Sequence, residues 1–157
     1  MTTGLRVLAR LGLLALALSR VESARAEPIK QARNDVITQT LAYLNIPYLW
    51  GGEHPRTGLD CSGFVQLVFR KAGLELPRAA RDQYAATVFL RPSRVLPGDL
   101  VFFAIKHPGT ARVDHVGIYL GKGYFIHASV TNGIHVEPIT KPYYQERLVA
   151  IRKYSGF

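Results

Sequence analysis

The sequence of 157 residues contains a single cysteine, Cys61, so no disulfide can form within the chain. In an oxidising compartment a lone thiol is a liability, because it is open to oxidation and to mixed disulfides. The plain alternative is a buried cysteine that packs as a small apolar side chain. The residues around Cys61 decide between these two interpretations.

The sequence also lacks an N-terminal apolar run long enough to cross a bilayer. Its run covers residues 11–18, whereas a membrane-spanning helix needs about 20 residues. Two arginines precede this run, and Ala24-Arg25-Ala26 follows it with small residues at the two positions that a signal peptidase reads. This pattern predicts an export signal over residues 1–26. We expect a soluble product in the periplasm or secreted, beginning near Glu27.

A buried first helix is the alternative for the same region. It is disfavoured because Arg20 and Arg25 fall where its inward face would continue. No cysteine lies near the predicted cleavage site. We therefore expect neither a lipid anchor nor stable membrane insertion after cleavage.

Basic residues outnumber acidic ones, with 20 Lys and Arg against 11 Asp and Glu. Removal of residues 1–26 takes away four arginines and one glutamate, which leaves a net charge of +6. A basic exported protein suits an anionic partner such as wall peptides, a membrane surface or nucleic acid. Because the basic residues are scattered and form no dense run, we expect no nucleic-acid binding and interpret most of them as solvated surface.

Residues 27–157 predict one domain, because no repeat or Gly- or Ser-rich linker interrupts them and their length suffices for one core. Helical spacing of apolar residues predicts helices over residues 31–44, 60–73 and 78–86. Runs rich in β-branched and aromatic residues predict strands over residues 100–104, 116–120, 124–130, 134–137 and 148–151. Helices followed by an antiparallel meander indicate an α+β fold, with helices packed against one sheet.

Cys61 falls in the first turn of the second predicted helix, directly after Asp60, a good N-cap residue. A helix N-terminus offers unpaired N–H groups and a partial positive charge, which favour a thiolate over a thiol. The same N–H groups can bind an oxyanion when a carbonyl is attacked. The charge of Asp60 opposes the thiolate unless capping or a substrate amine engages its carboxylate. This placement favours a reactive cysteine that faces the sheet.

Two histidines on consecutive predicted strands can supply the base that a thiol nucleophile needs. A three-residue loop over residues 121–123 would pair Leu120 with Tyr124. This register places His115 and His127 on one face as diagonal neighbours. His127 can then hold the second nitrogen of His115 and fix its tautomer. A two-residue loop would put the two histidines on opposite faces.

Zinc bound by the same cysteine and histidines is an alternative, but the sequence has neither a C-x-x-C nor an H-x-x-x-H spacing. We therefore expect no metal and no organic cofactor. The other histidines are interpreted as surface-loop or strand-edge residues: His54, His107 and His135. Asp99 is interpreted as a turn residue and Asp114 as an exposed carboxylate.

Six motifs in order resemble the NlpC-type cell-wall peptidase family of the papain-like superfamily, from about Gln31 to Arg152. The motifs are Pro47-Tyr48-Leu49-Trp50-Gly51-Gly52, Asp60-Cys61-Ser62-Gly63-Phe64-Val65-Gln66, Leu76-Pro77-Arg78 with Gln83, Leu96-Pro97-Gly98-Asp99-Leu100-Val101-Phe102-Phe103, His115-Val116-Gly117-Ile118-Tyr119-Leu120-Gly121 and Phe125-Ile126-His127-Ala128-Ser129. Each motif is weak alone, but the six together are specific. The resemblance implies a papain-like α+β fold with an antiparallel sheet of about five to six strands.

The resemblance also implies roles for individual residues. Cys61 is implied as the nucleophile, His115 as the base and His127 as the residue that orients the base. In addition, the hydroxyl of Tyr48 is implied to assist the oxyanion. In relatives that require a free amino end on the stem peptide, the residues equivalent to Asp60 and Ser62 help to bind that amine.

The implied activity is hydrolysis of peptidoglycan peptides that contain D-amino acids, after γ-D-glutamate or at diaminopimelate cross-links. Two other functions stay open. One is an amidase or acyltransferase that uses the same Cys–His pair, which a wide apolar entrance beside Cys61 would favour over a polar groove. The other is an effector toxin that degrades the wall of a competitor.

Overall fold

The computed structural model describes residues 26–157, so the predicted export signal lies outside the described residues except for its last position. The chain divides into two units, with the boundary after residue 31. In the first unit, residues 26–31 are helical. Of the helices in the described range, none combines the length and the apolar character needed to cross a membrane.

In the second unit, the first helical segment ends at residue 41, earlier than predicted. Asn45 follows with a φ of 66°, in the left-handed region that terminates helices. The two later predicted helices are present with shorter bounds, as α2 (Cys61–Lys71) and α3 (Ala80–Ala85). Gly73, the predicted stop of α2, has a φ of 76°, a conformation that glycine adopts without steric cost.

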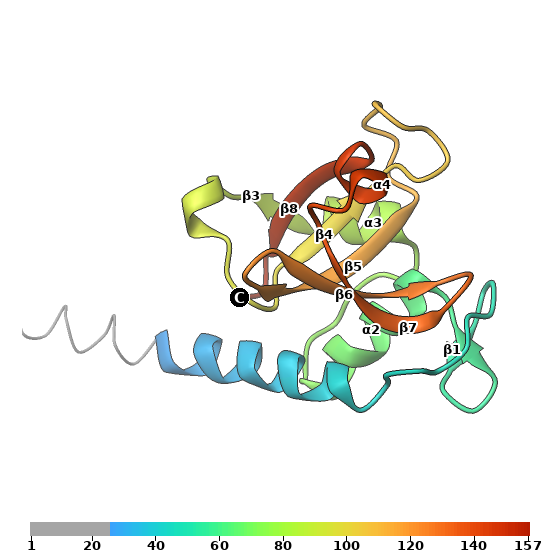
Figure 1. Ribbon diagram of the computed structural model, residues 1–157. Coiled ribbons are helices and arrows are strands. Elements are labelled where there is room, and N and C mark those ends of the chain that lie inside the picture. The colour runs from blue at the N-terminus through green and yellow to red at the C-terminus, as the bar shows by residue number, and fades with distance from the viewer. Residues whose placement is uncertain (1–25) are drawn as a thin grey trace, which may run out of the picture. The chain divides into compact units, whose positions relative to one another are not determined.

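Six antiparallel strands form the main sheet, in the spatial order β3-β8-β4-β5-β6-β7 (Figure 1). Their bounds are Thr87–Phe89 for β3, Leu100–Phe103 for β4, His115–Gly121 for β5, Tyr124–Ser129 for β6, Gly133–Pro138 for β7 and Leu148–Tyr154 for β8. The α+β class is confirmed, and β4 to β7 form the predicted meander. The meander prediction was wrong for the last strand, because β8 returns to pair with β4 and carries β3 on its other side.

Several short elements were not predicted. They are β1 (Glu53–His54), β2 (Gly58–Leu59), β3, the 3₁₀ turn η1 (Pro92–Arg94) and α4 (Pro142–Gln145). Each has only two to four residues, which is too few for a periodic apolar pattern to appear.

Different helices cover the two faces of the sheet. Neighbouring side chains of a strand point to opposite faces. Phe102 of β4 contacts Tyr84 of α3, with ring centroids 5.1 Å apart. The next residue, Phe103, contacts Tyr144 of α4, with ring centroids 5.6 Å apart. The face that carries Phe103 is therefore the one that α4 covers.

A buried ion pair joins the first helical segment to the turn before β4. Nη2 of Arg33 lies 2.8 Å from Oδ1 of Asp99, whose side chain is fully buried. Arg33 also donates to the carbonyl of Pro97 and lies over the ring of Phe157, 4.2 Å from its centroid. Burial raises the pKa of Asp99, and the charge of Arg33 opposes this shift. Asp99 is a turn residue as predicted, and it also anchors the helix.

Candidate active site

Cys61 is the first residue of α2, and Asp60 is its N-cap. Oδ1 of Asp60 accepts a hydrogen bond from the N–H of Gly63 at 2.7 Å. A Cβ at Gly63 would collide with the carbonyl oxygen of Gly52, so this glycine lets the start of α2 approach the loop that carries Tyr48. The side chain of Cys61 is only 8% exposed. The helix start thus holds the thiol in a fixed, largely buried position.

The surroundings of the thiol favour its neutral form in the free protein. Burial raises the pKa of Cys61 to about 11, and the Asp60 carboxylate adds to the shift. The backbone N–H groups of Val116, Ser62 and Cys61 hydrogen bond the sulfur and lower its pKa, but they do not offset burial. The predicted thiolate preference of the helix N-terminus is therefore outweighed. At neutral pH Cys61 needs a base that takes its proton when it attacks.

The hairpin of β5 and β6 aligns the two histidines as predicted, but its loop is shorter than predicted. Its loop has two residues, because Gly121 pairs with Tyr124. Leu120, which was predicted to pair with Tyr124, instead forms a bulge in β5. The bulge restores the residue that the shorter loop removes, so Ile118 pairs with Ile126. The predicted pairing of Leu120 with Tyr124 was wrong, whereas the predicted register holds from Tyr119 toward His115.

His115 and His127 contact one another directly. Nε2 of His115 lies 2.7 Å from Nδ1 of His127. Room for this contact depends on Gly117, since a Cβ there would lie 3.1 Å from the Cβ of His127. Burial lowers the pKa of His115 to about 4, against the opposing effect of nearby carboxylates such as Asp114. His115 is therefore a neutral imidazole at neutral pH and can accept a proton.

Tyr144 extends the histidine pair and was not found from the sequence. Its hydroxyl lies 3.1 Å from Nε2 of His127, and the residue is 6% exposed. Burial raises the pKa of Tyr144 to about 12, so the hydroxyl keeps its proton. The only local signal in its sequence is Pro142, which suits a helix start but points to no function.

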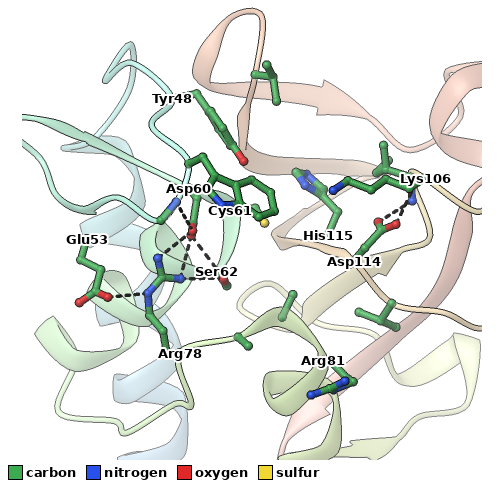
Figure 2. Close-up of a pocket in the computed structure, with 17 residues that line it drawn as sticks. Tyr48, Glu53, Asp60, Cys61, Ser62, Arg78, Arg81, Lys106, Asp114 and His115 are labelled. Carbon is green, nitrogen blue, oxygen red and sulfur yellow. Dashed lines mark hydrogen bonds and ion pairs between the residues drawn. The ribbon is translucent and has the colours of Figure 1, made fainter.

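An open pocket of about 840 Å³ lies over the thiol (Figure 2). Figure 2 shows the imidazole of His115 and the hydroxyl of Tyr48 directed toward Cys61 from different sides. Burial raises the pKa of Tyr48, with the nearby Cys61 as the next cause, so its hydroxyl remains a donor. At the rim, Nζ of Lys106 lies 4.8 Å from the ring centroid of Trp50. The pocket thus brings a thiol, an imidazole and a phenol hydroxyl to one space.

The carboxylate of Asp60 is already fully engaged. Arg78 donates to both of its oxygens, at 2.9 and 2.7 Å (Figure 2). The N–H groups of Gly51 and Gly63 and the hydroxyl of Ser62 donate to it as well. A substrate amine could bind Asp60 only by displacing one of these donors. The amine-binding role of Asp60 and Ser62 therefore stays a prediction.

Other polar residues named from the sequence lie around this centre. Asp114, interpreted as an exposed carboxylate, is half-buried, and it accepts hydrogen bonds from the N–H groups of Ile105 and Lys106 at 2.7 and 2.9 Å. It lines the pocket next to His115. His135 lies on the edge strand β7, with its ring centroid 4.9 Å from that of His127.

The zinc alternative finds no support in the geometry. Within residues 26–157, no group of three or more His, Cys, Asp or Glu side chains is arranged to hold a metal ion. Both ring nitrogens of His127 already have a protein partner, since Nδ1 faces His115 and Nε2 faces Tyr144.

Comparison with known proteins places this geometry in a family. The NlpC/P60 family matches residues 45–153. The chain is 42% identical over 115 residues to the bifunctional muramidase/DL-endopeptidase CwlT of Bacillus subtilis, covering 73% of this chain and 34% of that protein. It is 34% identical over 143 residues to the murein DD-endopeptidase MepH of Escherichia coli, covering 87% and 51% of the two chains.

A solved structure agrees with these relatives. An NLP/P60 family protein of Staphylococcus aureus, described as similar to a lipoprotein, superposes with a TM-score of 0.71 at 36% identity. The match covers 78% of this chain and 41% of the other. The chain thus spans half or less of the length of most of the proteins compared here. With its helix-borne cysteine, paired histidines and six-stranded antiparallel sheet, the chain belongs to the NlpC/P60 family.

Proposed function

We propose that this chain is an exported cysteine endopeptidase that hydrolyses peptide bonds in peptidoglycan stem peptides or cross-links. The observation that carries the proposal is the open pocket in which Cys61, at a helix N-terminus, faces His115, whose far nitrogen is bonded to His127. A nucleophile, a base and a group that orients the base are the parts that acyl transfer requires. Relatives named as endopeptidases support peptidoglycan as the substrate.

The proposed reaction has two steps. Cys61 attacks the peptide carbonyl carbon while His115 takes the thiol proton, and the C–N bond then breaks as His115 gives that proton to the leaving amine. The N–H of Cys61 and the hydroxyl of Tyr48 stabilise the oxyanion. His115 next removes a proton from water, which attacks the thioester and releases the carboxylic acid. The thiol is regenerated when His115 returns the proton to sulfur.

The lining of the pocket bears on the kind of substrate. Six of its residues carry carboxylate, guanidinium or ammonium groups: Glu53, Asp60, Arg78, Arg81, Lys106 and Asp114. Arg78 bonds to both Glu53 and Asp60, so the other three groups are the ones left to face a substrate. Because these carry charges of both signs, they suit a peptide that presents carboxylates and ammonium groups, as wall peptides do. The bonds proposed are those after γ-D-glutamate or those within diaminopimelate cross-links, because relatives are named for both DL- and DD-endopeptidase activity.

A digest of purified peptidoglycan tests this proposal. The protein and its Cys61→Ala variant are incubated with wall fragments under reducing conditions, and the products are identified by mass spectrometry. New peptide ends made only by the unsubstituted protein are expected, and their masses identify the bond. If neither protein cleaves wall material while both are folded, the endopeptidase function is wrong.

A further inference from the structure

The side chain behind the histidine pair is buried on all sides. Tyr144 lies on α4 and packs against Phe103 and Phe125, with ring centroids 5.6 and 5.0 Å away. Its hydroxyl lies 3.1 Å from Nε2 of His127, and His127 is 2% exposed. Both ring nitrogens of His127 therefore have one partner each within the protein: Nδ1 faces His115 and Nε2 faces Tyr144.

A neutral imidazole carries one N–H, so His127 can arrange its hydrogen bonds in two ways. In the first, Nε2–H donates to the Tyr144 oxygen, and Nδ1 accepts from Nε2–H of His115. In the second, Tyr144 donates to Nε2, and Nδ1–H donates to Nε2 of His115. The proton of neutral His115 then sits on Nε2 in the first arrangement and on Nδ1 in the second.

Only the first arrangement suits the proposed reaction. With Nε2 of His115 bonded to His127, Nδ1 is the ring nitrogen left to take the proton of Cys61. That nitrogen is free only in the first arrangement. Once His115 is an imidazolium, both of its nitrogens carry protons, and His127 must accept from Nε2–H. The second arrangement would then set two N–H donors against each other.

We propose that Tyr144 is a positioning residue, which accepts the Nε2–H of His127 and thereby keeps His127 as the acceptor that makes His115 a base. The inference rests on the proposed function. It adds Tyr144 as a fourth residue to Cys61, His115 and His127. Without the Tyr144 oxygen, the Nε2–H of His127 would be buried without an acceptor, which is costly. The pair would shift toward the arrangement in which His115 presents Nδ1–H to the thiol.

The ionisation states fit this role. Burial, together with the neighbouring His115 and His135, lowers the pKa of His127 to about 2, so it is neutral at the working pH. Burial also keeps the hydroxyl of Tyr144 neutral, so it can accept from or donate to His127, and it is the proposed reaction that requires it to accept. The titratable or charged groups around His115, His127 and Tyr144 are Asp60 at the N-cap of α2, Asp114 and His115 at β5, His135 and Glu137 on β7, and Lys141 and Tyr143 at α4.

The test compares Tyr144→Phe with Tyr143→Phe. The first change removes one oxygen and keeps the ring, whereas Tyr143 is 46% exposed and serves as the matched control from the same helix. Because Cys61 is the only thiol in the chain, its rate of alkylation by iodoacetamide can be followed against pH without any wall substrate. NMR correlation of ring protons with ring nitrogens in the isotope-labelled protein gives the tautomer of His127 directly.

In the unsubstituted protein we expect His127 to carry its proton on Nε2. In Tyr144→Phe we expect a shift toward Nδ1–H and a roughly tenfold decrease in alkylation rate and in kcat/KM, as for one buried hydrogen bond. The acid limb of the profile, where His115 loses its proton, should move to lower pH, because the imidazolium loses its acceptor. Tyr143→Phe should change none of these quantities.

Two results would overturn the proposal. One is a His127 that carries its proton on Nδ1 in the unsubstituted protein. The other is a folded Tyr144→Phe variant with an unchanged tautomer and pH profile, which would make the tyrosine a packing residue only. Neither readout needs peptidoglycan, so failure of the proposed hydrolysis and failure of this inference are distinguishable.

Discussion

Nε2 of His115 lies 2.7 Å from Nδ1 of His127, although the two residues come from different strands. The contact occupies one ring nitrogen of His115 and leaves the other for Cys61. It also fixes the plane of the imidazole, since a ring bonded at one nitrogen cannot turn freely about its side-chain bonds. The orientation of the base thus depends on a hairpin register more than on any residue that would touch substrate.

Substitution of His127 should therefore act through His115. We expect His127→Ala to decrease kcat/KM on wall fragments by roughly 100-fold or more, because the base loses its orienting partner. His127→Asn should retain more activity, since a side-chain carbonyl can still accept from Nε2–H of His115, as in Cys-His-Asn enzymes. The two variants are compared by steady-state kinetics. Equal activity of Ala and Asn at position 127 would contradict the orienting role.

Acid should destabilise the fold through the same pair. Burial lowers the pKa of His115 to about 4 and that of His127 to about 2, from an ordinary value of 6.5. The unfolded chain binds protons below pH 6.5 while the folded chain does not, so stability present at neutral pH is lost as pH falls toward 4. The measurement is the urea midpoint at pH 7.5 and at pH 4.5.

His127→Asn supplies the comparison for this pH effect, because it removes one of the two buried imidazoles and leaves the carboxylates unchanged. We expect the variant to lose less stability between the two pH values than the unsubstituted protein. An equal loss in both proteins would show that other groups cause the acid sensitivity.

The charge of Asp60 should be visible in the titration of Cys61. Its carboxylate is the second cause, after burial, of the raised thiol pKa. Asp60→Asn keeps a capping oxygen but removes the charge, so alkylation of the thiol should shift to lower pH. Glu53→Gln is the control, because Glu53 also pairs with Arg78, at 2.8 Å. A shift of the same size in both variants would assign the effect to Arg78 instead.

The buried ion pair between Arg33 and Asp99 should matter for stability. Arg33→Ala leaves a buried carboxylate unpaired, which typically costs about 3 kcal/mol or more of the free energy of unfolding. Because burial raises the pKa of Asp99, the loss should shrink at acid pH, where the carboxyl is protonated in the variant. Chemical denaturation at two pH values measures both effects.

Arg81→Ala is the matched control, since Arg81 pairs with Asp82 at 3.6 Å on a side chain that is 84% exposed. An exposed pair of this kind contributes roughly 0.5 kcal/mol or less. A loss as small for Arg33→Ala as for this control would mean that the buried pair contributes little to the fold.

The sequence predicted which residues lie together in the pocket better than it predicted the strand pairing that brings them together. Cys61 directly follows a capping aspartate, and such a local pattern can be recognised in the sequence. To predict the alignment of the two histidines, one must know the length of the loop after β5. That loop is one residue shorter than predicted, and a bulge at Leu120 compensates for the missing residue, so the register of the histidines is unchanged. No propensity scale distinguishes that pair of changes from the simpler three-residue loop.

Longer-range features were harder to predict for a physical reason. Tyr144 reaches His127 across seventeen positions from a four-residue helix, and its packing on Phe103 and Phe125 is decided by tertiary contacts. The ion pair of Asp99 was not predicted, because its partner, Arg33, lies 66 positions away. The periodicity of apolar residues indicates which face of a helix or strand is buried. It does not indicate which polar group of a distant element contacts that face.

The position of β8 in the sheet has a consequence for the order in which the protein folds. The strand Leu148–Tyr154 is synthesised after the other five strands of its sheet, yet it lies between β3 and β4 and pairs with both. Until it emerges, β4 has an unpaired edge and β3 has no neighbour in the sheet. The sheet can therefore be completed only after all six of its strands have been synthesised. Completion of this sheet therefore depends on pairing between segments that are far apart in the sequence, which is a slow kind of contact to form during folding.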